Sequence, residues 1–147
     1  MRELVAEMVE IARTKASEDY LLAPVFGAFA EGASSYDIVF VALLGSTSEE
    51  DRVLKNACEA LVRGAKVIES QIASLNDIDL KHIAYRLASL MMALAYAPYN
   101  EEVLRNYLVR EVVLTHMMLT GAIQVIEFTS KEVAKIIAQG GPPTLEA

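Results

Sequence analysis

The sequence feature that most constrains this fold is an apolar heptad that runs unbroken from Leu54 to Leu75. Its members recur in alternating steps of four and three residues: Leu54, Cys58, Leu61, Ala65, Ile68, Ile72 and Leu75. That spacing keeps one narrow seam of a long helix facing a neighbouring helix. A second seam follows at Leu80, Ile83, Leu87, Leu90, Leu94 and Ala97. Two successive seams predict a long antiparallel helix pair, and therefore an all-α protein built from packed helices.

Capping residues and helix breakers divide the rest of the chain into further helices. The expected elements are residues 2–15, a helix capped by Ser17 that runs to Glu31 with Pro24 kinking it or delaying its start, residues 49–76 after the cap Ser48, a helix from the cap Asp77 to Pro98, one from Asn100 to Phe128, and a last one from Thr129 or Ser130 to Ala138. We therefore predict a single-domain bundle of six or seven helices over residues 1–139. The Gly/Pro-rich residues 140–147 are expected to be disordered.

One segment is ambiguous between helix and strand. Residues 36–44 are short and include Val39, Phe40 and Val41, which favour a strand. A lone strand in a helical chain would leave its backbone groups without partners. We therefore predict a buried helix over residues 36–44.

Composition bounds the class of protein. The chain has 147 residues and is 54% apolar, above the roughly 45–50% of ordinary soluble domains. That excess favours self-association. The longest apolar run, residues 38–44, is far shorter than the roughly 20 residues that cross a bilayer. No leader pattern follows Met1, and a single cysteine, Cys58, allows no intrachain disulfide, so we expect a cytoplasmic protein.

The charge balance disfavours one class of partner. Thirteen basic and twenty acidic residues give a net charge of −7. Proteins that bind nucleic acid through its phosphates usually carry the opposite sign, although a local basic patch can exist on an acidic chain. The balance favours protein partners, and no membrane is expected.

The helix expected after Asn100 carries polar residues within a largely apolar sequence. They are Arg110, Glu111, His116, Gln124 and Glu127. Either they form a polar site in the core, or they line an exposed strip or pair with their neighbours. The second interpretation is favoured, because polar residues are mostly exposed and buried charges are usually paired.

Arg110 and His116 have a sharper interpretation. Five residues separate them, and an Arg followed by a His at this distance resembles the loose motif of the HEPN ribonucleases, small helical dimers. The resemblance implies a ribonuclease with Arg110 and His116 as its catalytic pair. On a straight helix, however, six steps of about 100° leave the two side chains roughly 120° apart.

Metal and cofactor sites have little support. The chain has two histidines, His82 and His116, and neither has Glu three residues before it, as a di-iron bundle requires. Asp79, His82 and Arg86 share one helix face, which is interpreted as a solvated charge ladder. Cys58 lies on the seam, where a small buried hydrophobe is the expected role. No glycine-rich phosphate loop is present, so no cofactor is expected.

A mixed stripe lies on the first long helix. It consists of Arg52, Lys55, Glu59, Arg63 and Lys66. Glu59 stands four residues from both Lys55 and Arg63, the spacing of intrahelical ion pairs, so a solvated outer face is favoured. The alternative is that Arg52, Lys55, Arg63 and Lys66 contact nucleic acid. A small helical subunit of this kind would resemble, in size and style, those of archaeal CRISPR effector complexes.

The sequence therefore leads to three hypotheses about function. The preferred one is a non-enzymatic small subunit or adaptor that packs its helices against itself or a larger protein assembly. The second is a HEPN-like ribonuclease using Arg110 and His116. The third is a nucleic-acid-associated subunit using the stripe at residues 52–66.

Overall fold

A computed structural model describes residues 2–18, 23–43 and 51–120, and every regular element within these ranges is helical. Six α-helices are present there: α1 (Arg2–Glu18), α2 (Ala23–Ala33), α3 (Tyr36–Leu43), α4 (Asp51–Ile72), α5 (Ile78–Tyr96) and α6 (Val109–Thr120). Two short elements join α5 to α6: the 3₁₀ turn η1 (Ala97–Tyr99) and the π-helical segment η2 (Val103–Leu108). The prediction of an all-α protein is confirmed.

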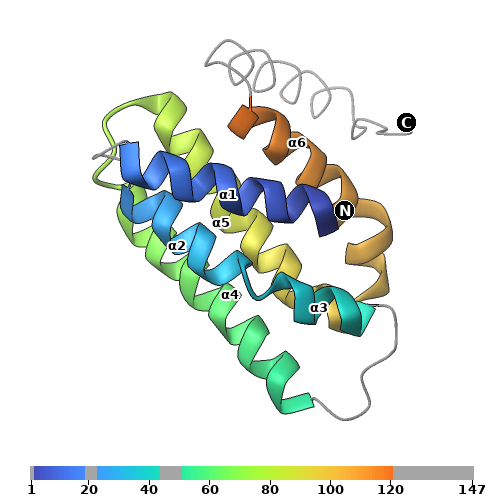
Figure 1. The fold of residues 1–147 in the computed structure, drawn as a ribbon. Helices are drawn as coiled ribbons and strands as arrows, with labels where there is room; N and C mark the ends of the chain where they lie inside the picture. The colour runs from blue at the N-terminus through green and yellow to red at the C-terminus, as the bar shows by residue number, and fades with distance from the viewer. Residues whose placement is uncertain (1, 19–22, 44–50, 121–147) are drawn as a thin grey trace.

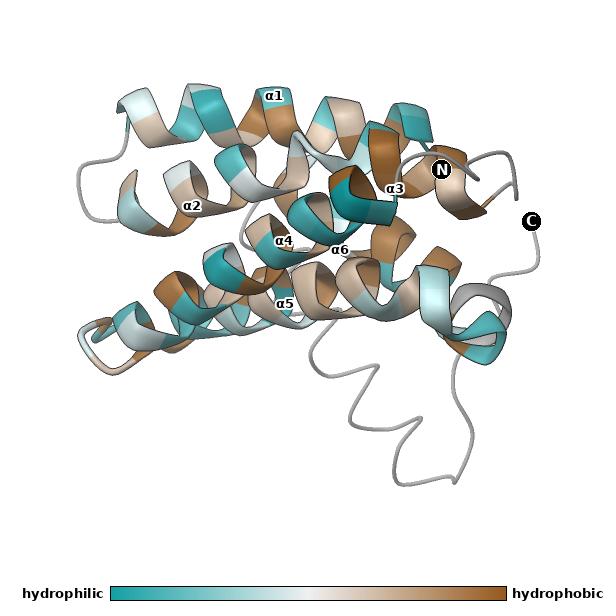
Figure 2. Ribbon diagram, turned by 90° about the horizontal axis from the view of Figure 1, so that it is seen from below, coloured by the Kyte–Doolittle hydropathy of each residue, from teal (hydrophilic) through white to brown (hydrophobic). Residues whose placement is uncertain are grey.

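The helices pack side by side around a shared apolar core. Figure 1 shows α2 between α1 and α4, with α5 behind them and α6 beside α1. After α4 the chain turns back over residues 73–77, and α5 lies along α4 (Figure 1). Teal and brown residues alternate along α1 and α4 in Figure 2, as expected for helices with one buried and one solvated face.

The two seams supply much of this core. Leu54, Cys58, Leu61, Ala65 and Ile68 of α4 are all buried, and so are Leu87, Leu90 and Leu94 of α5. The side chains of Leu61 and Leu87 are fully enclosed, each with 0% relative exposure. Because residues three and four apart share a helix face, the periodicity alone identified these inward positions.

Glycine allows α2 and α4 to approach closely. A Cβ atom added to Gly64 would lie 3.0 Å from the carbonyl oxygen of Ala28, and one added to Gly32 would lie 3.1 Å from that of Ala60. Both would also collide with the terminal methyl group of Met91, a fully buried residue of α5. Small residues therefore set the spacing of α2 and α4, and Met91 fills the space beneath them.

Two predicted helix caps are present. The Asp77 carboxylate accepts a hydrogen bond from the backbone N–H of Asp79 at 2.8 Å. The Asn100 side-chain oxygen accepts from the N–H groups of Glu102 at 3.0 Å and Val103 at 3.2 Å. These contacts satisfy N–H groups that a helix start otherwise leaves unpaired.

Other predicted boundaries were wrong. Ser17 does not cap a second helix, because α1 continues to Glu18 and the Ser17 hydroxyl donates to the backbone oxygen of Thr14 at 2.7 Å. Pro24 is the second described residue of α2, and a first-turn position is one that tolerates proline. The first seam helix ends at Ile72 instead of Asn76, where the N–H of Leu75 bonds to the oxygen of Ile72 in a turn.

The ambiguous segment at residues 36–44 is helical, as predicted, over α3. Its burial is narrower than expected: Tyr36 and Val39 are buried, whereas Val41 is 36% exposed. Ile38, Phe40, Ala42 and Leu43 are half-buried against the core, so only Asp37 and Val41 form the exposed strip of this short helix.

The helix predicted from Asn100 to Phe128 is helical throughout residues 101–120, where the described residues end, but its winding is not uniform. Val103–Leu108 is wound as a π-helix, and a regular α-helix begins at Val109. Nor is this region enclosed on all sides, since Tyr107, Val109 and Met117 are each more than 40% exposed. The proposed cap Ser48, the residues after Thr120 and the predicted tail at 140–147 lie outside the described ranges.

Within the described residues, no single helix has the length and hydropathy to cross a membrane. The pair α2 and α3, bent by 43° at their junction, meets both criteria only when the two helices are taken together.

Candidate functional site

The cations of the predicted stripe lie on the solvent face of α4. Arg52, Lys55, Arg63 and Lys66 are all exposed, as is Glu59. Three of the four cations border an open groove of about 440 Å³ between α4 and the C-terminal end of α5. It is lined by Lys55, Cys58, Glu59, Val62, Arg63, Lys66, Ala95, Tyr96 and Tyr99. Arg52 belongs to the same helix but does not line this groove.

Two tyrosines form the opposite wall of the groove. Tyr96 is 55% exposed and Tyr99 is 65% exposed, which is unusual for large aromatic side chains. The sequence analysis missed both. The available signal was two tyrosines flanking Pro98, but nothing local placed them beside cations some 30 residues earlier in the chain.

The base of the groove is small and uncharged. Cys58 and Ala95 are buried and Val62 is half-buried. Burial raises the pKa of the Cys58 thiol, and a hydrogen bond with Tyr99 opposes that shift. The pKa of Tyr99 is raised as well, first by burial and then by its contact with Cys58. Both groups are therefore neutral at physiological pH, which agrees with Cys58 acting as a small packing residue.

Arg110 and His116 both lie on the regular helix α6. Six α-helical steps set their side chains about 120° apart around its axis. His116 instead faces α1, where its Nε2 atom is 3.2 Å from Oε2 of Glu7, without forming a hydrogen bond. The geometry of α6 therefore does not bring the two residues of the HEPN-like motif together within one chain.

A buried ion pair joins α5 to α6. Nη1 of Arg86 donates to both carboxylate oxygens of Glu111, at 2.9 and 3.1 Å, and Glu111 is only 6% exposed. The interpretation of Asp79, His82 and Arg86 as a solvated ladder is therefore wrong for Arg86, whose partner lies on another helix. Burial, and then the Glu111 charge, raise the pKa of the adjacent Tyr107.

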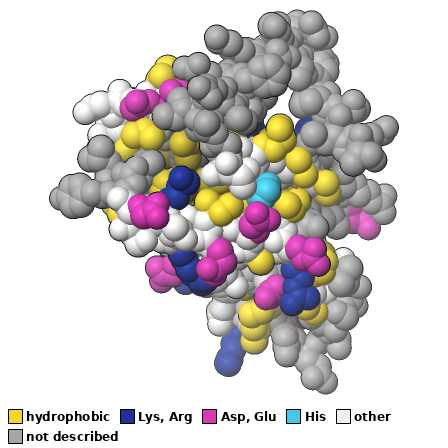
Figure 3. Space-filling view, turned by 45° about the horizontal axis from the view of Figure 1, so that its top comes forward, with side chains coloured by type: hydrophobic (Ala, Val, Ile, Leu, Met, Phe, Trp, Pro, Cys, Tyr) yellow, Lys and Arg dark blue, Asp and Glu magenta, His cyan; other side chains and the backbone are white. Residues whose placement is uncertain are grey.

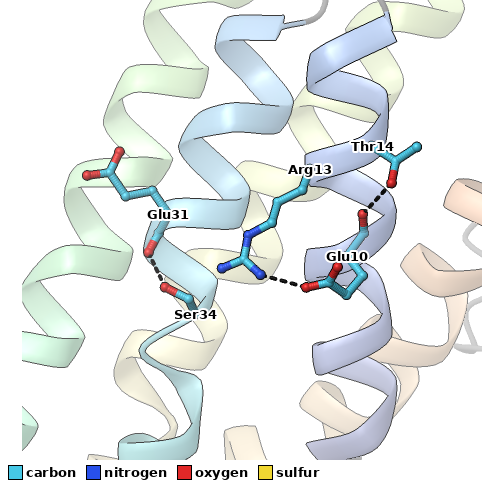
Figure 4. A network of polar contacts seen from close by, with 5 residues as sticks. All are labelled: Glu10, Arg13, Thr14, Glu31 and Ser34. Atoms are coloured by element: carbon cyan, nitrogen blue, oxygen red, sulfur yellow. Dashed lines mark hydrogen bonds and ion pairs between the residues drawn. The ribbon is translucent and has the colours of Figure 1, made fainter.

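A small cavity of about 250 Å³ lies among α1, α2 and α3. Its edge carries the ion pairs Arg2–Asp37 at 2.7 Å and Arg13–Glu10 at 2.6 Å. Figure 4 shows Arg13 reaching Glu10 between α1 and α2. Tyr36 also lines the cavity, and its buried hydroxyl has no hydrogen-bond partner among the described residues. Both arginines are already neutralised here, so the cavity has no cation left for an anionic ligand.

The outer face of α5 carries an unexpected apolar row. Ile78, Tyr85 and Tyr96 are exposed by 69%, 67% and 55%, respectively. At about 100° per residue, these three positions point within roughly 20° of one direction over five helical turns. His82, Ser89 and Met92 lie close to the same line. We call the row Ile78–His82–Tyr85–Ser89–Met92–Tyr96 the outer seam.

By contrast, the face that includes α1 is mixed in charge. Figure 3 shows acidic and basic side chains interspersed with apolar ones across it. Within the described residues, no three His, Cys, Asp or Glu side chains gather as a metal site would require.

Comparison with known proteins adds no assignment: no protein-family model, no curated protein and no solved structure matches this chain.

Proposed function

We propose that this protein is a non-enzymatic helical subunit that works by packing its helices against a second copy of itself. The outer seam of α5 carries this proposal. It places the exposed side chains of Ile78, Tyr85 and Tyr96 on one line of α5. The half-buried Met92 and the polar His82 and Ser89 complete the row, and its spacing of three and four residues suits the packing of another helix.

The two heptad seams, Leu54–Leu75 and Leu80–Ala97, are not the proposed dimer contact. Their buried residues lie inside one chain, where α4 and α5 form an antiparallel pair in heptad register within a helical bundle. Self-association then depends on the outer seam, in which the described residues of the same chain leave Ile78, His82, Tyr85 and Tyr96 exposed. Its only ionisable side chains are His82 and two tyrosines, so a second copy meets no row of like charges.

A second copy is the occupant that this surface fits best. In a symmetric dimer the same row from each subunit packs against itself, so each exposed tyrosine meets another apolar side chain. Binding to a larger protein assembly would use the same face.

Sedimentation equilibrium at micromolar concentration tests the proposal. The wild-type protein, with a chain mass of 16.1 kDa, should sediment as a dimer. Tyr85→Lys should shift it to a monomer, because a charge at the centre of the seam would have to be desolvated on association. A monomeric wild type over the whole concentration range would refute self-association.

Val67→Lys is the matched control. Val67 is an exposed apolar residue of α4, 46% accessible, and lies outside the outer seam. This variant should remain dimeric while carrying the same new charge. Equal dissociation of both variants would show that net charge, and not the seam, governs association.

A further inference from the structure

We propose that the groove between α4 and the end of α5 binds single-stranded nucleic acid. In this arrangement Lys55, Arg63 and Lys66 contact phosphates along one wall, and bases stack on Tyr96 and Tyr99 along the other. The positions of the cations, the exposure of the tyrosines and the local charge of the groove support this arrangement.

Two of the three groove cations, Lys55 and Lys66, lie along one line of α4. Lys55 and Lys66 are eleven residues apart, which places them within about 20° of the same direction on α4 and about 16 Å apart along its axis. A wall of that length can contact a few successive phosphates of a single strand. Arg63 lies between them, beside Lys66 on the next turn of the helix.

The tyrosines supply the second requirement of such a site. Nucleic-acid-binding grooves for single strands combine cations that follow the backbone with exposed aromatic rings on which bases stack. Tyr96 and Tyr99 are more than half exposed and face the same groove as the cations. An acidic peptide would use the cations but would leave both rings without a partner.

The remaining groove residues favour an anion over a cation. Lys55, Glu59, Arg63 and Lys66 are the charged residues that line the groove, and they sum to a local charge of +2. The Cys58 thiol at the base of the groove adds no negative charge, since burial raises its pKa. The groove is thus locally positive on a chain whose net charge is −7.

A single strand fits better than a duplex. Bases become available for stacking on a protein ring only where they are unpaired. The overall negative charge opposes long-range attraction, so binding should be modest and should depend strongly on salt.

Fluorescence anisotropy of a labelled oligouridylate, titrated with the full chain at low ionic strength, tests the proposal. Tyr99→Ala should weaken binding about tenfold, and Tyr99→Phe, which keeps the ring, should restore it. Lys55→Ala should weaken binding and lower the slope of log affinity against log salt by about one. Lys81→Ala is the matched control, because Lys81 is a cation of α5 outside the groove. It should change the affinity and the salt slope less than Lys55→Ala does.

Three results would overturn the proposal. They are no binding at low salt, binding that the groove variants leave unchanged, and equal competition by oligoglutamate or by duplex RNA. Tyr85→Lys separates this proposal from self-association, because Tyr85 lies in the outer seam but not in the groove. Tyr96 belongs to both surfaces, so self-association would cover one of the two stacking rings. The monomeric variant should therefore bind the oligonucleotide at least as tightly as the wild type, and weaker binding would count against the groove.

Discussion

Arg86 and Glu111 meet across the interface of α5 and α6, where Nη1 of the arginine lies 2.9 Å from one carboxylate oxygen and 3.1 Å from the other. The side chains are only 20% and 8% exposed. Taking two charges out of water is costly, and their mutual attraction offsets that cost only while both are present. This pair therefore selects one packing of α6 on α5 more than it adds net stability.

The pair predicts a strongly non-additive double-mutant cycle. Arg86→Met leaves the Glu111 carboxylate buried without its partner and should lower the free energy of unfolding by about 3–5 kcal/mol. Adding Glu111→Leu to that variant should recover most of the loss, because two apolar side chains leave no buried charge. Urea denaturation of the two single variants and the double variant measures this. Simple additivity of the two single effects would contradict it.

The enclosed leucines of the two seams predict large losses of stability. Leu61→Ala or Leu87→Ala should each cost about 2–5 kcal/mol, because each leaves a cavity in the core. Arg63→Ala, on the exposed face of the same helix as Leu61, should cost less than about 1 kcal/mol. Equal losses for core and surface substitutions, measured by thermal or urea unfolding, would mean that the inward face of α4 is misassigned.

The close approach of α2 and α4 predicts opposite effects for two glycines. Gly64→Ala should cost about 1–3 kcal/mol, because the new methyl group would press on the Ala28 backbone and on Met91. At Gly27 an added Cβ meets nothing within 4 Å. Gly27→Ala should therefore raise stability by about 0.5–1 kcal/mol through the higher helix propensity of alanine. The two variants are compared in the same unfolding assay, and a loss at both sites would reject the packing explanation.

Tyr36 predicts a dependence of stability on alkaline pH. Burial raises the pKa of its hydroxyl in the folded protein above the ordinary value. The unfolded chain therefore releases this proton first, from about pH 10, and the Tyr36 contribution falls by about 1.4 kcal/mol per further pH unit. Because the hydroxyl is buried with no hydrogen-bond partner in the part of the chain that the structure describes, Tyr36→Phe should be at least as stable near neutral pH. Its advantage over the wild type should widen between about pH 10 and 11, and a constant difference would argue against a buried hydroxyl.

The nuclease hypothesis has a direct test. We expect purified protein to leave single-stranded RNA intact, because Arg110 and His116 diverge by about 120° around α6. Cleavage that His116→Ala abolishes, with an unchanged circular dichroism spectrum, would establish the nuclease instead. Binding without cleavage would agree with the groove proposal.

Much of the local structure was predictable because its causes are local. The helical periodicity identified the inward residues of α4 and α5, such as Leu61 and Leu87. Asp77 and Asn100 begin their helices with hydrogen bonds to backbone N–H groups two or three residues ahead. Even the short segment of α3 could be assigned as helix, from the need of its backbone groups for partners.

The end of α4 and the winding of the segment before α6 were less predictable from the sequence. α4 stops at Ile72 although the apolar pattern continues to Leu75, which is itself buried in the following turn. The π-helical winding of Val103–Leu108 also has no clear signal in the sequence. In both places tertiary packing overrides the local sequence pattern, because intrinsic helix propensities are small compared with packing energies.

The sequence by itself determined the helical class, the inward face of each long helix and the start of two of them. Only the tertiary structure decided which helix faces meet. It brings Arg86 to Glu111, 25 residues away, and places the cations of α4 beside Tyr96 and Tyr99. The physical reason is that periodicity depends on residues one turn apart along a single helix. The choice of neighbour depends instead on how side chains from distant segments fit and on which buried charges find a partner.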